Sequence, residues 1–555
     1  MTAPHADLVL TGGPVHLGNP ARSRATAVAV SGDRIVAVGG DDVRDLVGPR
    51  TEVVDLAGRL LTPGFQDAHV HPVGGGLELG QCDLTGLIDI DDVRARIREY
   101  AGNNPDAPWI TGGGWSMETF DGWPDRAFLD ALVPDRPVYL VNRDHHGAMA
   151  NTRALELAGV DTRTPQPADG RFEVDADGAP TGMLQEGAMG LVGAHVPVAT
   201  LDELVAGLLR AQDLLHSLGI TAWQDALVGD NPLLPNAGPA YAKAIADGRL
   251  TARVVASLWW QRDRGAEQIE DLLAQRAQLE AAGLRASTVK IMQDGVAENH
   301  TAAMLTPYLR GCGCRAGGDH AGISFVDPEA LRKHVTELDR LGFQIHFHAL
   351  GDRAVREALD AVEAARDANG WSDGRPHLAH LQVVHPDDVG RFRALGATAN
   401  MQPLWAAHEP QMDELTMPFL GPERSAWQYP FASLRDAGAT LAAGSDWPVS
   451  SPDPLAGIHV AVNRTEPGGD AAVFYPEQRI DLGTALAAYT SGSAYVNHLD
   501  DTGTIAVGNL ADLVVLDRDP FAHPAEEISE TRVEQTYVGG RRVYDASSVS
   551  RSSAG

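Results

Sequence analysis

The chain has 555 residues, 44% of them hydrophobic, so it can bury a large core and carry attached units. Its formal net charge of −31 repels phosphate groups and anionic lipids, which argues against nucleic-acid and membrane partners. The chain holds three cysteines (Cys82, Cys312 and Cys314) and no leader-like or membrane-spanning apolar run, so we expect a cytoplasmic protein without a disulfide framework.

Both ends of the chain are predicted to be rich in β-structure. Short strand-like runs separated by turns occur within residues 1–62. Similar runs, with a hairpin at Gly539-Gly540, occur within residues 481–555. We expect the two ends to pair into one small β-sandwich, with a larger domain between them at residues 63–480.

Strand-like and helix-like segments alternate through this larger domain, as in repeated strand–helix units with parallel strands. Eight strand-like runs favour a closed sheet, so the expected fold class is α/β, a (β/α)₈ TIM barrel. The stretch from about residue 75 to 200 is too long for a loop and predicts an inserted subdomain after the first strand. The eight runs are 65–71, 221–225, 253–260, 288–293, 344–349, 377–383, 397–402 and 440–446.

Residues able to bind a metal stand at the ends of these runs. His69 and His71 close the first run, and alternate residues of a strand share a face, so both rings point the same way. Catalytic groups of such a barrel come from the carboxyl ends of its strands. Any one of the candidate ligands could be a polar core residue, but the placement of several at strand ends favours a metal site. The further candidates are Lys290, His348, His380 and Asp446, with His346 as a competitor on the face of His348.

This donor set fits two divalent ions about 3.5–4 Å apart. Imidazole and carboxylate ligands suit Zn²⁺ best, with Mn²⁺, Fe²⁺ or Co²⁺ as alternatives. An ammonium group has no free lone pair, whereas Lys290 carbamylated by carbon dioxide would present a carboxylate that bridges both ions. Bound metal would lower the pKa of water to give hydroxide, and Asp446 would pass the proton to a leaving nitrogen.

Five segments carry a resemblance to the amidohydrolase superfamily, specifically its amidohydrolase-3 or YtcJ-like branch, which includes N-substituted formamide deformylases. They are residues 62–72, 289–295, 348–354, 444–449 and 503–516. The resemblance implies metal ligation by the four histidines His69, His71, His348 and His380, a bridging carbamylated Lys290, and Asp446 as ligand and acid/base. His377 and Ala379 stand where the family usually has Arg and Glu.

The resemblance also covers the insertion. Residues 144–151 are similar to a family segment whose histidine, here His146, reaches the substrate or its oxyanion; a hydrogen bond within the loop is the alternative. Glu186 falls in a second such segment and is a pocket candidate. Trp115, Trp405 and Trp447 suggest an apolar or aromatic substrate wall, although structural packing would equally explain them.

The expected activity is metal-dependent hydrolysis of a non-peptide carbon–nitrogen bond, in an amide or N-formyl group of a small molecule, by a metal-activated hydroxide. One alternative is a mononuclear deaminase of a cyclic amidine, in which Lys290 would be merely structural. Another is a non-catalytic barrel scaffold. A homodimer is the default expectation for the assembly.

Overall fold

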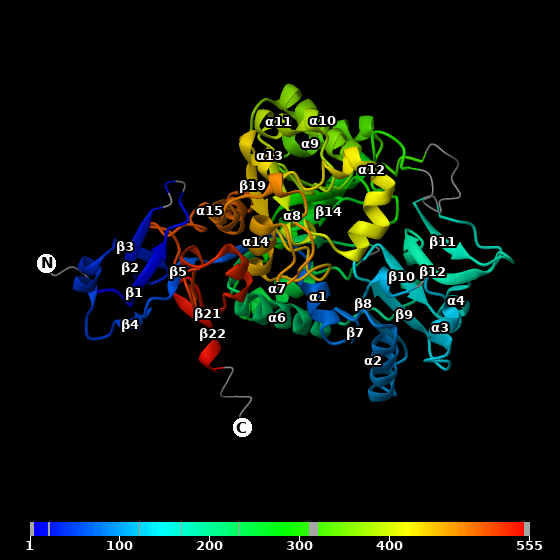
Figure 1. The fold of residues 1–555 in the computed structure, drawn as a ribbon, viewed down its shortest axis with the longest axis horizontal. Coiled ribbons are helices and arrows are strands. Elements are labelled where there is room, and N and C mark those ends of the chain that lie inside the picture. The colour runs from blue at the N-terminus through cyan, green and yellow to red at the C-terminus, as the bar shows by residue number, and fades with distance from the viewer. Residues whose placement is uncertain are drawn as a thin grey trace.

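The computed structural model describes residues 5–19, 21, 23–120, 122–167, 169–231, 234–309 and 320–548. Cys312 and Cys314 lie outside the described residues. Three units follow one another along the longest axis of the molecule (Figure 1). The barrel lies in the middle, a sheet built from both chain ends lies on one side, and the insertion lies on the other.

The sheet of the chain ends has eight strands. β5 (Leu60–Pro63) pairs antiparallel with β20 (Leu513–Leu516), and this pairing joins the N-terminal and C-terminal parts within one hydrogen-bonded sheet. The two ends therefore associate as the sequence predicts. The remaining strands are β1 (Leu8–His16), β2 (Arg24–Ser31), β3 (Arg34–Gly39), β4 (Glu52–Asp55), β21 (Val533–Val538) and β22 (Arg541–Asp545).

The barrel contains eight strands at the eight predicted places, and the seven pairs of neighbouring strands in the described sheet are all parallel. The last strand meets the first at the carboxyl end, where the Asp446 N–H donates to the His69 carbonyl at 2.8 Å and the His71 N–H donates to that of Trp447 at 2.8 Å. The strands are β6 (Phe65–Val70), β13 (Ile220–Val228), β14 (Arg253–Trp259), β15 (Arg285–Met292), β16 (Gln344–Ala349), β17 (His377–His380), β18 (Thr398–Met401) and β19 (Thr440–Ala443).

Two barrel strands, β17 and β19, end three residues earlier than predicted. β17 stops at His380 because His380 and Leu381 adopt φ values of 81° and 50°, which are incompatible with a continuing strand. β19 stops at Ala443, and Asp446 lies three residues later with a φ of 57°. Both candidate ligands thus occupy turns at the barrel mouth.

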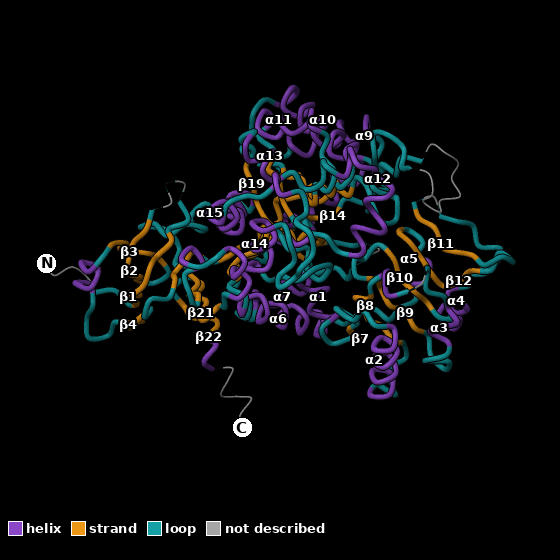
Figure 2. The backbone as a smooth tube through the Cα atoms, in the orientation of Figure 1, coloured by secondary structure: helices purple, strands orange, loops and turns teal. Residues whose placement is uncertain are grey.

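Helices surround the barrel strands (Figure 2). In α10 the buried positions follow the helical period, so one apolar face packs inward. The Thr200 side chain and Glu203 form a capping box at the start of α6. The helices are α1 (Pro72–Glu78), α6 (Leu201–Ser217), α7 (Gly238–Ala246), α8 (Ile269–Ala281), α9 (Pro328–Arg340), α10 (Asp352–Asn369), α11 (Pro386–Leu395), α12 (Met417–Ser425), α13 (Phe431–Asp436) and α14 (Pro454–Asn463).

The barrel is completed by residues beyond 480, its predicted end. α15 (Leu482–Ala487) and α16 (Ser493–Val496) follow that position. The Val496 carbonyl accepts a hydrogen bond from Gln344 at the start of β16, and Asn497 reaches Gln224 on β13. The chain therefore covers the amino end of the barrel before it returns to the end sheet at β20.

The insertion is a separate layer of sheet and helices, as predicted. It has its own buried apolar cluster, which includes Cys82, Ile97 and Leu140. Its strands, in sheet order, are β11 (Gly170–Val174), β12 (Pro180–Glu186), β10 (Gly147–Ala150), β9 (Val138–Asn142), β8 (Ile110–Trp115) and β7 (Cys82–Asp83). Its helices are α2 (Ile90–Asn103), α3 (Arg126–Asp130), α4 (Thr152–Ala158) and α5 (Met189–Gly193).

Trp115 corrects one expectation. Its side chain is fully buried in the core of the insertion, against Phe120, and its indole N–H donates to the Leu140 carbonyl at 2.9 Å. Packing therefore explains this residue, and it does not belong to the substrate wall. Among the residues that the structure describes, no helix combines the length and the apolar character needed to span a bilayer.

Candidate metal centre

The six predicted metal ligands line one cavity of about 70 Å³ at the carboxyl end of the barrel. The Asp446 carboxylate is central: its Oδ1 lies 3.0 Å from Nε2 of His69 and 3.0 Å from Nε2 of His71. Nδ1 of His380 lies 3.9 Å from Oδ2 of the same carboxylate. Ligand atoms of His69, His380 and Asp446 all lie within 4.8 Å of one another.

Lys290 and His348 complete the cavity. Lys290 is only 3% exposed, and its Nζ has no hydrogen-bond partner among the described residues. Burial lowers the pKa of this amine to about 7, so a large fraction is neutral at physiological pH. An unpartnered buried amine is unusual, because leaving such a group without a hydrogen bond is unfavourable.

The cavity brings a neutral imidazole, His69, against an ionised carboxylate, Asp446. Burial, reinforced by nearby Lys290, lowers the pKa of His69 to about 3. Burial raises the pKa of Asp446, but the attraction of His69 and His380 and a hydrogen bond from His71 hold it well below its usual value. The site thus offers neutral imidazoles and an ionised carboxylate.

Asp67 positions the loop that carries Asp446. Its carboxylate accepts hydrogen bonds from the Ser445 hydroxyl at 2.6 Å and from the Ser445 N–H at 3.1 Å. It also accepts one from the N–H of His69 at 2.9 Å. A single side chain therefore orients the backbone at two candidate ligands.

A second buried acidic residue, Asp294, supports the ring of His348. Its Oδ1 lies 3.3 Å from Nδ1 of His348, which leaves Nε2 of that ring for the cavity. The carboxylate also accepts N–H groups of Leu350, Gly351 and Ala303 at 2.8–3.1 Å. A carboxylate behind a metal-ligating imidazole commonly fixes its tautomer and orientation.

His146 and Glu186 lie together at the edge of this cavity. Nδ1 of His146 is 2.9 Å from Oε1 of Glu186, which also accepts the Thr301 hydroxyl at 2.9 Å. Burial lowers the pKa of His146, but the Glu186 carboxylate more than offsets this and raises it to about 9. The insertion thus presents an imidazolium near His348, with ring centres 5.6 Å apart.

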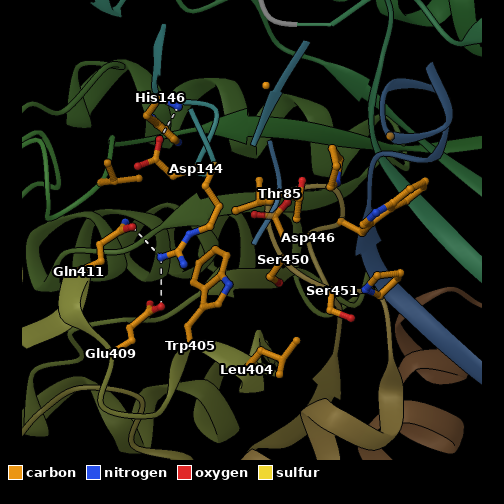
Figure 3. A pocket seen from close by; sticks show the side chains of 18 of the residues that line it. Thr85, Asp144, His146, Leu404, Trp405, Glu409, Gln411, Asp446, Ser450 and Ser451 are labelled. Atoms are coloured by element: carbon orange, nitrogen blue, oxygen red, sulfur yellow. Dashed lines mark hydrogen bonds and ion pairs between the residues drawn. The ribbon is translucent and has the colours of Figure 1, made fainter. Parts of the chain in front are cut away.

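A larger cavity of about 480 Å³ adjoins the cluster and shares His146, His348 and Asp446 with it. Figure 3 shows His146, Trp405 and Asp446 around this space. The Trp405 ring stacks on His380 with centres 5.2 Å apart, and Trp447 also lines the cavity. Glu186 lies behind His146 and does not line it.

The donor set fits a divalent metal. Both ring nitrogens of His380 lack a hydrogen-bond partner among the described residues, as does the Lys290 amine. Buried lone pairs that converge beside an ionised carboxylate are satisfied by a cation. His346 does not compete for this place, because its Nε2 faces Nδ1 of His69 at 2.8 Å and it lines neither cavity.

Comparison with known proteins identifies the family. A sequence model described as the amidohydrolase family matches residues 52–544. The chain belongs to the amidohydrolase family.

Relatives match this amidohydrolase over nearly its whole length. Protein LONG AFTER FAR-RED 3 of Arabidopsis thaliana is 31% identical over 97% of this chain and 92% of its own length. Putative amidohydrolase YtcJ of Bacillus subtilis is 30% identical over 90% of this chain and 92% of its own length. The N-substituted formamide deformylase of Arthrobacter pascens is 28% identical over 97% of this chain and 98% of its own length. The resemblance drawn from the motifs is thereby confirmed.

A solved structure agrees with this assignment. An uncharacterized metal-dependent hydrolase from Pyrococcus horikoshii superposes with a TM-score of 0.72 at 26% identity, covering 93% of this chain and 99% of that chain. The amidohydrolase fold therefore extends across the end sheet, the barrel and the insertion.

Sequence reasoning left several residues of this amidohydrolase without a role. Asp67 and Asp294 lie inside the matched motifs, beside the predicted ligands, and act through hydrogen bonds that only the folded chain shows. Ser257 and His346 occupy inward positions of barrel strands. Their signal was a polar residue within a run that should otherwise be apolar.

Proposed function

We propose that this amidohydrolase is a binuclear metal-dependent hydrolase that cleaves a non-peptide carbon–nitrogen bond in a small-molecule amide, with N-formyl amines as the first class to test. The observation that carries the proposal is the unpartnered Lys290 amine in one cavity with four histidines and Asp446. The similarity to the N-substituted formamide deformylase of Arthrobacter pascens supports the N-formyl class.

Lys290 supports two ions because it can become an anion. Its lowered pKa makes the neutral amine available to attack the carbon of carbon dioxide. A new N–C bond forms, the nitrogen loses one proton, and the product is a carbamate with two oxygen donors. His69, His71, His348, His380 and Asp446 would supply the remaining ligands.

When bound, the ions supply Lewis-acid chemistry: they polarise the amide carbonyl and lower the pKa of water. Nitrogen and oxygen ligands of this kind suit zinc, with manganese, iron or cobalt as alternatives.

Asp446 is suited to transfer the proton between water and the amide nitrogen. It remains ionised because its histidine neighbours hold its pKa low, so it can accept a proton from water in the cavity. It lines both cavities and can therefore reach the amide nitrogen. The water oxygen bonds to the amide carbon, and transfer of the proton to the nitrogen then allows the carbon–nitrogen bond to break, which gives a carboxylate and an amine.

His146 is suited to hold the substrate. Glu186 accepts from its Nδ1 and keeps the ring charged, so Nε2–H remains available to donate to the amide carbonyl oxygen. Trp405, Trp447 and Leu404 supply apolar walls beyond this point. A cavity of about 480 Å³ is of a size that suits a small molecule.

The test combines metal analysis with a substrate panel. Protein reconstituted with zinc, manganese, iron or cobalt is incubated with N-formyl, N-acyl and cyclic amides, and the released amine is quantified. We expect two metal equivalents per chain and amine release only after reconstitution. One metal equivalent, with ammonia released from a cyclic amidine and full activity in Lys290→Gln, would instead indicate the deaminase. Failure to bind any metal would favour a scaffold.

A further inference from the structure

A continuous hydrogen-bonded chain crosses the interior of the barrel from its amino end to His69. It begins at the main-chain carbonyls of Arg375 and Val496, which can only accept, and both accept from Nε2 of Gln344 at 2.8 Å. These two contacts fix the orientation of the Gln344 amide. Its Oε1 therefore accepts, and Nε2 of Gln224 donates to it at 3.2 Å.

The direction of every later hydrogen bond follows from this anchor. Gln224 turns its Oε1 toward Ser257, whose hydroxyl donates to it at 3.1 Å. The Ser257 oxygen then accepts from Nδ1 of His346, 3.3 Å away. His346 is left with a lone pair on Nε2, which lies 2.8 Å from Nδ1 of His69.

We propose that Ser257 and His346 are positioning residues for the metal centre, because they keep the ring proton of His69 on Nδ1 and so leave the Nε2 lone pair for the ion. Nε2 is the atom that faces Asp446, at 3.0 Å. The inference rests on the metal centre of the proposed function, and it adds two residues that are not themselves ligands.

The reverse direction of these hydrogen bonds, with the His69 proton on Nε2, is less favourable. If Ser257 donated to His346, the Gln224 Oε1 would lose its hydrogen-bond donor among the described residues, at a buried position. Leaving a buried acceptor unsatisfied is unfavourable. His346 would then donate to His69, and the proton on His69 would lie on Nε2, where it blocks metal ligation.

A neighbouring histidine provides a matched control. His377 is as buried as His346, and the two rings lie 3.9 Å apart. Its Nδ1 faces the Asn400 amide at 3.1 Å, so it stands outside the chain that reaches His69. Replacing either ring by phenylalanine preserves a similar volume, but only one replacement removes the acceptor for His69.

The experiment measures zinc affinity, which does not depend on turnover. Chelator-stripped protein is titrated with zinc in competition with a chromophoric chelator, and the ligand-field spectrum of the cobalt form is recorded. We expect His346→Phe to weaken zinc binding by about 10–100-fold and to alter the cobalt spectrum. We expect His346→Gln, whose amide oxygen can accept from His69, and His377→Phe to stay within about threefold of wild type.

Ser257 gives an independent arm if His346→Phe does not fold. Ser257→Ala is expected to weaken zinc binding by about tenfold, and Ser257→Thr, which keeps the hydroxyl, to restore it. The zinc affinities are compared only among variants whose urea-unfolding midpoint equals that of wild type. Wild-type affinity in folded His346→Phe, equal losses in His346→Phe and His377→Phe, or wild-type affinity in Ser257→Ala would overturn the assignment. Absence of metal binding by wild-type protein would overturn the proposed function as well.

Discussion

The Asp67 carboxylate and the Ser445 hydroxyl, 378 residues apart, meet at 2.6 Å. This hydrogen bond ties the first barrel strand to the loop that follows the last strand, one residue before Asp446. The closure of the barrel and the placement of its central candidate ligand therefore depend on the same contact.

Ser445→Ala tests that contact. Removing a hydrogen bond to a buried carboxyl group is expected to lower the free energy of unfolding by about 1–3 kcal/mol. Urea unfolding of metal-depleted protein measures it, and Ser31→Ala at an exposed strand end is the control. Equal stability of both variants and wild type would show that the loop is held by other contacts.

Asp446→Asn tests the proton transfer. The amide cannot take a proton from water, so amine release is expected to fall by about 10²–10⁴-fold. His71→Ala is expected to lose activity through metal loss. Circular dichroism and metal content accompany both assays, with exposed Asp367→Asn as the matched control. Near-normal turnover in folded Asp446→Asn would remove this residue from the mechanism.

The His146–Glu186 pair predicts a pH dependence of stability. The pKa of His146 is raised from 6.5 to about 9, so its contribution is fully present below pH 6.5 and is lost as the pH rises through 9. The loss amounts to about 3 kcal/mol. We expect the unfolding free energy of metal-depleted wild type to fall over this interval and that of Glu186→Gln to fall much less. Parallel pH profiles would contradict the pairing.

Lys290 is predicted to carry the carbamate. Protein reconstituted with metal and ¹³C-labelled bicarbonate is expected to give a carbamate carbon resonance that Lys290→Gln lacks. Lys243, an exposed lysine paired with Asp247 at 2.9 Å, provides the control substitution Lys243→Gln, which should keep the signal. A resonance that survives in Lys290→Gln would place the label elsewhere.

Asp294→Asn tests the support behind His348. Loss of the carboxylate behind a ligating imidazole is expected to weaken zinc binding by about 10–100-fold. The exposed variant Asp367→Asn should bind zinc as wild type does. If Asp294→Asn changes the unfolding midpoint but not the zinc dissociation constant, the residue only supports the turn before α10.

The sequence allowed the barrel strands to be predicted because each is a short apolar run bounded by turns. It also allowed the candidate ligands to be predicted, because His69 and His71 alternate at the end of a strand-like run and the others stand at or near the carboxyl ends of later runs. Whether these side chains act as ligands stays a prediction, although the structure brings them into one cavity.

Other features depend on contacts between distant segments. Trp115 is the last residue of the glycine-rich strand β8 and could face either way until the insertion packs around it. The hydrogen-bonded chain from Gln344 to His69 needs four strands to come together, and no spacing along the sequence encodes that. The ends of β17 and β19 were predicted three residues too late, because left-handed backbone at residues other than glycine has no strong local signal.

The insertion has a consequence for how new specificities arise. Its sheet and apolar core are its own, yet it delivers His146 to the mouth of a barrel that supplies every candidate ligand. Under the proposed function, changes within residues 82–193 would alter substrate recognition without altering the candidate metal ligands. Exchange of this segment between relatives is a direct route to altered selectivity.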